Sequence, residues 1–202
     1  MASVTLPDRH FTQPPYPVRQ FTVDEYHRLI ENGILGENDR VELLEGWIVP
    51  KMTHNPPHDG TIQIISKRLR RWTPQKWDIR IQSAVTMTDS EPEPDLAIVR
   101  DLEREYLARH PGPPDIGLLI EVAESSLIQD REDKARIYAR AGIPTYWIIN
   151  LVDARIEVFN DPTGSEGQPA YRGRAIYTHE ELVTLVLDGT EIARIPAKDL
   201  LP

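Results

Sequence analysis

Charged side chains placed within apolar segments constrain this chain more than any other feature of its sequence. Asp95 directly precedes the apolar run 96–99, and Glu121 lies inside the apolar run 118–122. A carboxylate beside such neighbours is costly to bury unless another group compensates its charge. A divalent cation compensates it well, because hard cations prefer carboxylate oxygens. If the two segments form neighbouring strands, Asp95 and Glu121 can reach one ion.

Lys134 is the third such side chain, and it lies on a helix that we predict over 130–141 with Asp130 as its N-cap. Charged residues at 132, 136 and 140 form a stripe that we expect to face water. Two residues advance a helix by about 200°, so Lys134 should face the core side instead. There it can orient an attacking water or stabilise charge on a phosphate. The alternative is a structural ion pair with Glu121, with Asp95 capping a turn.

The rest of the chain mixes predicted strands and helices around a strand–helix–strand unit at 117–151, which is typical of an α/β sheet with helices packed on it. Apolar periodicity and turn residues predict helices at 22–33, 58–72, 102–109 and 179–187, the first with a capping box formed by Thr22 and Glu25. They predict a hairpin at 40–52 with its turn at Glu45 and Gly46, and strands at 79–88, 96–99, 117–122, 146–151, 155–159 and 170–177. In the helix at 58–72, the residues expected to face the core are Ile62, Ile65, Leu69 and Trp72.

Length and composition set broad limits. A chain of 202 residues can bury its own core, and we expect a proline-rich arm at 1–20 followed by one domain at 21–202. Cysteine is absent, which excludes disulfides and thiolate chemistry and fits a cytoplasmic protein. No segment is predicted to cross a membrane or to act as a secretory signal. The net charge of −9 argues against coating nucleic acid by bulk attraction, but not against an enzyme with a local basic strip.

Several short motifs together resemble a known family. They are the segments 41–46 and 93–96, the helix start near His58, the strand 120–122, the helix carrying Asp130, Lys134 and Tyr138, and the segment 141–147. The chain resembles the putative restriction endonuclease family of the PD-(D/E)XK nuclease superfamily over about residues 21–160. The resemblance implies a restriction-endonuclease-like fold, a mixed central β-sheet flanked by α-helices.

The same resemblance implies the roles of individual residues. Asp95 and Glu121 would be ligands of Mg²⁺ or Mn²⁺, and Glu42 would complete the metal shell or position water. The acidic-x-Lys motif of the superfamily would place lysine at 123, where this chain has Ala123. The resemblance therefore implies that the lysine role has moved to Lys134. On sequence alone, the more common explanation of Glu42 is an exposed strand residue.

Contacts with substrate phosphate are expected from four basic or polar residues of one helix: His58, Lys67, Arg68 and Arg71. A solvated face of an amphipathic helix is the more common explanation of such a strip. No base-reading motif is present, so DNA sequence specificity cannot be read. A homodimer is left open, because cutting both strands often needs two sites.

Three functions compete at this stage. The first is a Mg²⁺-dependent endonuclease that hydrolyses phosphodiester bonds of DNA, with Asp95, Glu121, Lys134 and Glu42 as its catalytic residues. The second is a non-catalytic nuclease-fold protein that binds DNA or a protein partner. The third is a glycosidase with a carboxylate acid/base pair; it is disfavoured, because Lys134 has no required role there.

Overall fold

The computed structural model describes residues 17–36, 38–53, 55–165 and 167–202, so most of the expected N-terminal arm lies outside the described residues. Its centre is a six-stranded sheet in the order β3-β4-β5-β6-β7-β8. All neighbouring strands are antiparallel except β5 and β6, which are joined by the predicted helical crossover and run parallel. The strands are β3 (Trp77–Ile81), β4 (Leu96–Arg100), β5 (Ile116–Ala123), β6 (Thr145–Asn150), β7 (Arg155–Pro162) and β8 (Tyr171–Tyr177). The expected mixed α/β sheet is confirmed.

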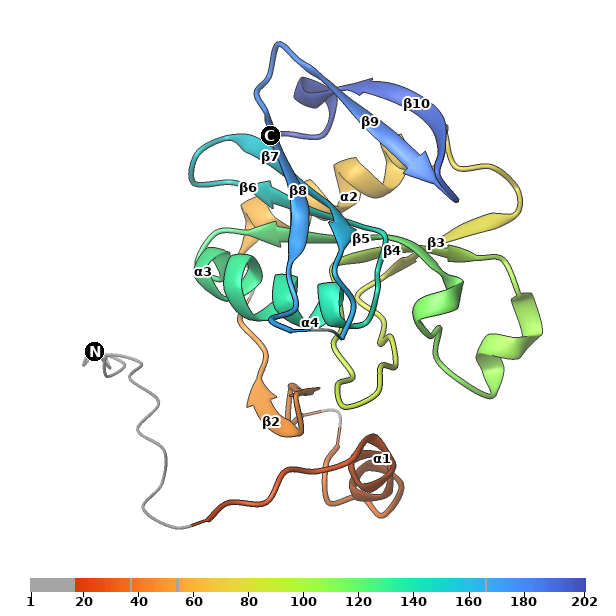
Figure 1. Cartoon of the computed structure of the whole chain (residues 1–202), viewed down its shortest axis with the longest axis vertical. Helices are drawn as coiled ribbons and strands as arrows, with labels where there is room; N and C mark the ends of the chain where they lie inside the picture. Colours follow the sequence, from red (N-terminus) through yellow and green to blue (C-terminus); the bar gives the residue numbers. More distant parts are fainter. Residues whose placement is uncertain (1–16, 37, 54, 166) are drawn as a thin grey trace.

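Helices and a hairpin cover the two faces of this sheet (Figure 1). One face carries α2 (Pro56–Leu69), the hairpin of β9 (Leu182–Leu187) and β10 (Thr190–Pro196), and the short η4 (Ala197–Asp199). The other face carries a continuous helical segment made of α3 (Leu127–Gln129), η3 (Asp130–Lys134) and α4 (Ala135–Arg140). Two 3₁₀ turns, η1 (Glu103–Leu107) and η2 (Pro113–Asp115), lie between β4 and β5.

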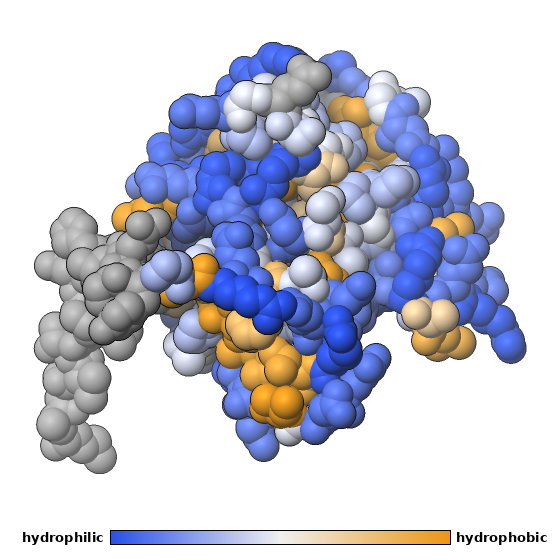
Figure 2. All heavy atoms as spheres, turned by 60° about the horizontal axis from the view of Figure 1, so that its bottom comes forward, coloured by the Kyte–Doolittle hydropathy of each residue, from blue (hydrophilic) through white to orange (hydrophobic). Residues whose placement is uncertain are grey.

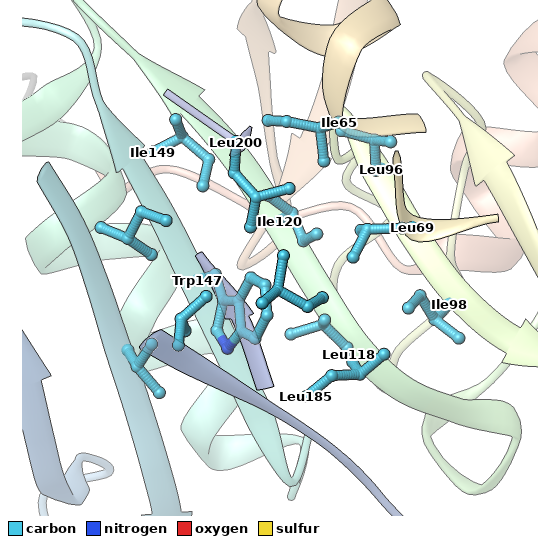
Figure 3. Close-up of a cluster of buried hydrophobic side chains, with 14 of the residues drawn as sticks. Ile65, Leu69, Leu96, Ile98, Leu118, Ile120, Trp147, Ile149, Leu185 and Leu200 are labelled. Carbon is cyan, nitrogen blue, oxygen red and sulfur yellow. The ribbon is translucent and has the colours of Figure 1, made fainter. Parts of the chain in front are cut away.

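Each face of the sheet has its own apolar core. Figure 3 shows the core under α2, where Ile65 and Leu69 pack with Leu185 against Ile120 and Trp147 of the sheet. The second core lies under α4 and includes residues of β4, β5, β6 and α4: Ala97, Val99, Leu119, Tyr138 and Ile148. Side chains alternate between the faces of a strand, so the strands that supply both cores are apolar along their whole length.

A smaller layer made of α1 (Val23–Glu31), β1 (Val41–Leu44) and β2 (Trp47–Pro50) lies below the helical segment in Figure 1. The predicted capping box is present, with Thr22 accepting from the Glu25 amide and Glu25 accepting from the Thr22 amide. The predicted hairpin turn is also present. Glu45 and Gly46 have φ values of 51° and 78°, the left-handed conformation of a tight two-residue turn.

Outside the helical segment 127–140, three predictions of local structure are wrong. The segment 179–187 contains the strand β9 instead of a helix, because Val183, Leu185 and Leu187 alternate inward and pair with the unpredicted β10. Trp72 is 47% exposed, since α2 ends at Leu69 before the indole can turn toward the core. The strand expected over 79–88 ends at Ile81.

In the part of the chain that the structure describes, no helix is long and apolar enough to cross a membrane. Figure 2 brings the bottom of Figure 1 forward and shows a mostly hydrophilic face whose most extended hydrophobic patch lies low in its centre. Exposed apolar side chains of α1, the segment after it and β2 include Ile30, Ile34 and Trp47.

Candidate active site

Strand register brings the two expected carboxylates together. Leu96 of β4 pairs with Ile120 of β5, so one step further along this antiparallel register Asp95 comes opposite Glu121. The Asp95 amide donates to Glu121 Oε2 at 3.3 Å, and the Val122 amide donates to Asp95 Oδ2 at 2.8 Å. Both carboxylates are buried, at 6% and 3% exposure. They face the core under α4, as the alternation of side chains predicts.

Lys134 reaches the same place from the helical segment above β5. Its Nζ lies 2.9 Å from Glu121 Oε1 and 3.8 Å from Glu42 Oε1. The prediction of Asp130 as an N-cap is wrong, because the helix starts at Leu127 and Asp130 begins a π-helical turn inside it. Asp130 and Lys134 are both buried at the two ends of this turn. Such π turns are frequent at functional sites.

Glu42 arrives from β1 and is buried, so its alternative interpretation as an exposed strand residue is wrong. Its Oε2 accepts a hydrogen bond from the Glu93 amide at 3.1 Å. The hairpin that carries Glu42 is held against α4 by ion pairs of Glu45 with Arg136 and Arg140. The stripe expected to face water is therefore only partly exposed, because its two arginines anchor the hairpin.

His58 and Tyr138 complete the contacts around the carboxylates. His58 lies at the start of α2, where Asn55 caps the helix, and its Nε2 is 3.2 Å from Asp95 Oδ2. The Tyr138 hydroxyl donates to Glu121 Oε1 at 2.8 Å. Glu121 Oε1 thus accepts hydrogen bonds from both Lys134 and Tyr138, while Glu121 Oε2 accepts from the Asp95 amide.

Charge at this site is strongly unbalanced. Four buried carboxyl groups face the cations Lys134 and His58; they belong to Glu42, Asp95, Glu121 and Asp130. Burial raises the pKa of Glu121 to about 8, with Asp130 and Asp95 adding to the rise and Lys134 opposing it. Burial likewise raises the pKa of Asp130 to about 6. A site with this excess of carboxyl groups favours a bound cation, because the cation compensates their charge.

At three other groups of the site, the attraction of neighbouring charges outweighs the effect of burial on the pKa. Burial opposes ionisation of Asp95, but hydrogen bonding and attraction from His58 outweigh it and lower the pKa of Asp95. Burial alone would lower the pKa of His58, but Asp95 raises it above its usual value. Burial would also lower the pKa of Lys134, yet the surrounding carboxylates hold it well above its usual value. The ammonium of Lys134 is therefore stable at neutral pH.

The carboxylates line one side of a cleft of about 810 Å³ between the helical segment, β1 and the start of α2. Its lining includes Glu42, His58, Asp95, Glu121, Asp130 and Lys134. Within the described residues, no three carboxylate or imidazole side chains are grouped closely enough to hold an ion by themselves. An ion here would be held by Asp95 and Glu121, with water and substrate oxygens completing its shell.

The basic strip is separate from this cleft. A second hollow near the other end of α2 is lined by Lys67, Arg68 and Arg71. Of the residues predicted to bind substrate, His58 lines the cleft.

Asp130 was assigned no role in the site from the sequence. The spacing 130, 134, 138 at one helical turn each is the signal that links Asp130 with Lys134 and Tyr138.

The fold is that of a nuclease-like α/β domain. A structure of similar fold is that of "a putative nuclease belonging to DUF820" from Anabaena variabilis ATCC 29413, with a TM-score of 0.61 and 16% sequence identity over 89% of this chain and 97% of that chain. The family model described as "Putative restriction endonuclease" (Uma2) matches residues 23–193, and the chain belongs to this family. No curated protein matches the sequence.

Proposed function

We propose that this protein is a divalent-metal-dependent endonuclease that hydrolyses phosphodiester bonds of DNA. The observation that carries the proposal is the meeting of Asp95, Glu121 and Lys134, from three separate elements, at the wall of one cleft. The family to which the chain belongs supports a nuclease role. The metal, the DNA substrate and the roles of these residues are what the proposal adds.

The donor set fits a hard cation. Asp95 and Glu121 offer carboxylate oxygens, which Mg²⁺ and Mn²⁺ prefer, and the site has more carboxyl groups than cations. The chemistry supplied on binding is polarisation of the scissile phosphate and a lower pKa of an attacking water. Cation binding would lower the raised pKa of Glu121, because a cation stabilises the ionised carboxylate.

The protein's own residues supply positioning and charge. Lys134 and Tyr138 hold Glu121 Oε1, which directs Glu121 Oε2 toward Asp95. The Lys134 ammonium stabilises negative charge that grows on a phosphate oxygen during attack. Glu42 Oε1, 3.8 Å from Lys134 Nζ, can accept a proton from the attacking water.

The reaction balances as a hydrolysis. Water adds to phosphorus, the bond from phosphorus to O3′ breaks, and the leaving oxygen takes up a proton. The products are a 5′-phosphate and a 3′-hydroxyl.

Ala123 does not take part in this scheme. It is fully buried in the apolar core under α4, where it is part of β5. The ammonium that the superfamily motif would place at 123 is supplied by Lys134, whose Nζ touches the carboxylate two residues earlier in the strand. The geometry supports the displaced lysine that the resemblance implies.

Plasmid nicking with Mg²⁺ or Mn²⁺ tests the proposal. Asp95→Asn and Glu121→Gln keep the shape of each side chain and should abolish nicking, whereas Glu132→Gln, on the exposed side of the same helical segment, should not change it. EDTA should stop the wild type. Equal nicking by the wild type and both site variants would reject the assignment.

A second candidate function is DNA binding without cleavage. Lys134 already donates a hydrogen bond to Glu121 Oε1 at 2.9 Å, which is a structural arrangement as much as a catalytic one. A gel-shift assay decides between the two functions. DNA retained by the wild type with no metal-dependent nicking would select the binding protein.

A further inference from the structure

A group of basic side chains surrounds a hollow of about 460 Å³ at the end of α2 away from the cleft. Lys67, Arg68 and Arg71 come from α2 and the turn that follows it, and Lys198 comes from η4 near the C-terminus. Among the described residues that line the hollow, Asp199 is the single acidic one; the others are Ile64 and Leu201. Two segments more than a hundred residues apart thus place four cations around one concave surface.

These four cations are not used by the fold. Across the described ranges, Lys67, Arg68, Arg71 and Lys198 form no ion pair. Their neighbour Arg70 does, with Arg70 Nη1 lying 3.6 Å from Asp78 Oδ1. The chain has a net charge of −9, so unpaired cations in one place form a local basic surface against an acidic background.

The chemistry of the hollow fits a chain of phosphates. Arginine forks and lysine ammonium groups are the side chains that bind phosphate oxygens, and several of them together suit a ligand with repeated charges. Lys67 and Arg68 at the end of α2 and Arg71 in the following turn all line this hollow, so they present their charges to one surface. A single small anion would need far fewer cations.

The position of the hollow relates it to the cleft. The same helix carries His58 at the cleft and Lys67 at the hollow, and nine residues of α-helix span about 14 Å. This is about four base pairs of B-DNA, at about 3.4 Å per pair. We propose that the hollow binds the backbone phosphates of the DNA whose cleavage we assign to the cleft, beyond the scissile bond. This inference rests on the proposed function.

Binding of a fluorescent duplex of about 24 base pairs, measured by anisotropy in EDTA, tests the inference without cleavage. The double variant Lys67→Gln/Arg71→Gln should raise Kd about tenfold or more. Each lost phosphate contact flattens the slope of log K against log salt by about 0.9, so the slope should flatten by about 2. The control Arg104→Gln/Arg172→Gln removes two exposed charges elsewhere and should change Kd less than twofold.

Thermal unfolding should be the same for both double variants, because all four side chains are exposed. Equal Kd and equal salt slope for the two double variants would overturn the inference, even if the wild type binds and nicks DNA. If Lys67→Gln/Arg71→Gln bound the duplex as the wild type does but lost the wild type's binding to phosphatidylserine vesicles, the inference would be overturned in favour of a membrane surface. Weakened duplex binding by Lys67→Gln/Arg71→Gln, with Asp95→Asn still binding as the wild type does, would support it.

Discussion

Glu121 should make the stability of this protein fall as pH rises, and Glu121→Gln should remove that dependence. The folded pKa of Glu121 is about 8, above its usual value of 4.5. Between these two pH values the folded state holds a proton on Glu121 that the unfolded state has lost. By linkage, stability from Glu121 is fully present below pH 4.5 and is lost as pH rises toward 8.

The size of the effect follows from the shift. The difference between 4.5 and about 8, at about 1.4 kcal/mol per pKa unit, gives about 5 kcal/mol at most. Local relaxation of the site keeps the expected figure at about 3–5 kcal/mol. The free energy of unfolding of Glu121→Gln, minus that of the wild type, should therefore increase by this amount between pH 5 and pH 8.

Urea unfolding in EDTA at several pH values measures this difference, with equal m-values for the two proteins as the check that the comparison is sound. Subtracting the wild-type curve removes the contributions of groups away from the site. Glu132→Gln, which is exposed, serves as the control and should show no such pH-dependent difference. Parallel curves for the wild type and Glu121→Gln would refute the reasoning, because they would mean that the proton is not bound at Glu121.

Three further predictions concern other parts of the chain. Tyr138→Phe removes the hydroxyl that donates to Glu121, so it should lower the free energy of urea unfolding by about 1–2 kcal/mol and slow nicking. Unchanged nicking would show that Tyr138 has no role in the active site. Burial opposes ionisation of Glu157, but hydrogen bonds from Arg131, Asn150 and Arg174 outweigh it and lower the pKa of Glu157 to about 2. Its stabilisation is therefore present above pH 4.5 and lost as pH falls toward 2. Glu157→Gln should cost about 1–2 kcal/mol at pH 7, after allowing for solvent screening, and the difference should shrink in acid melts. Gly46→Ala should lower the melting temperature by several degrees, because φ is 78° and the new Cβ would lie 2.6 Å from Gln20 Cβ; an unchanged melt would contradict this.

Local signals were sufficient for many of the elements. The capping box at Thr22, the turn at Glu45 and the buried face of α2 were all predicted, because each depends on residues a few positions apart. Alternation along strands also places Asp95 on the face of Ala97, and Glu121 on the face of Leu119. In the structure both of these neighbours belong to the core under α4. The helical angle likewise predicted that Lys134 would turn inward.

Other features depended on partners far away in the chain. The strand β9 formed because β10 pairs with it and the sheet accepts its apolar face, and neither condition is visible within a window of nine residues. Trp72 is exposed because α2 stops one turn before it. Asp130 was expected as a cap, but the helical segment begins at Leu127 and the π turn holds Asp130 in a buried position inside it.

The sequence by itself determined the capping of α1, the buried face of α2 and the inward direction of Lys134, since periodicity and capping are properties of neighbouring residues. Only the tertiary structure decided where those side chains meet. The register of β4 against β5 set Asp95 opposite Glu121, and the hairpin anchored to α4 brought Glu42 within 3.8 Å of Lys134. Strand pairing and layer packing are long-range choices between competing contacts, and they are settled by burial of the whole chain.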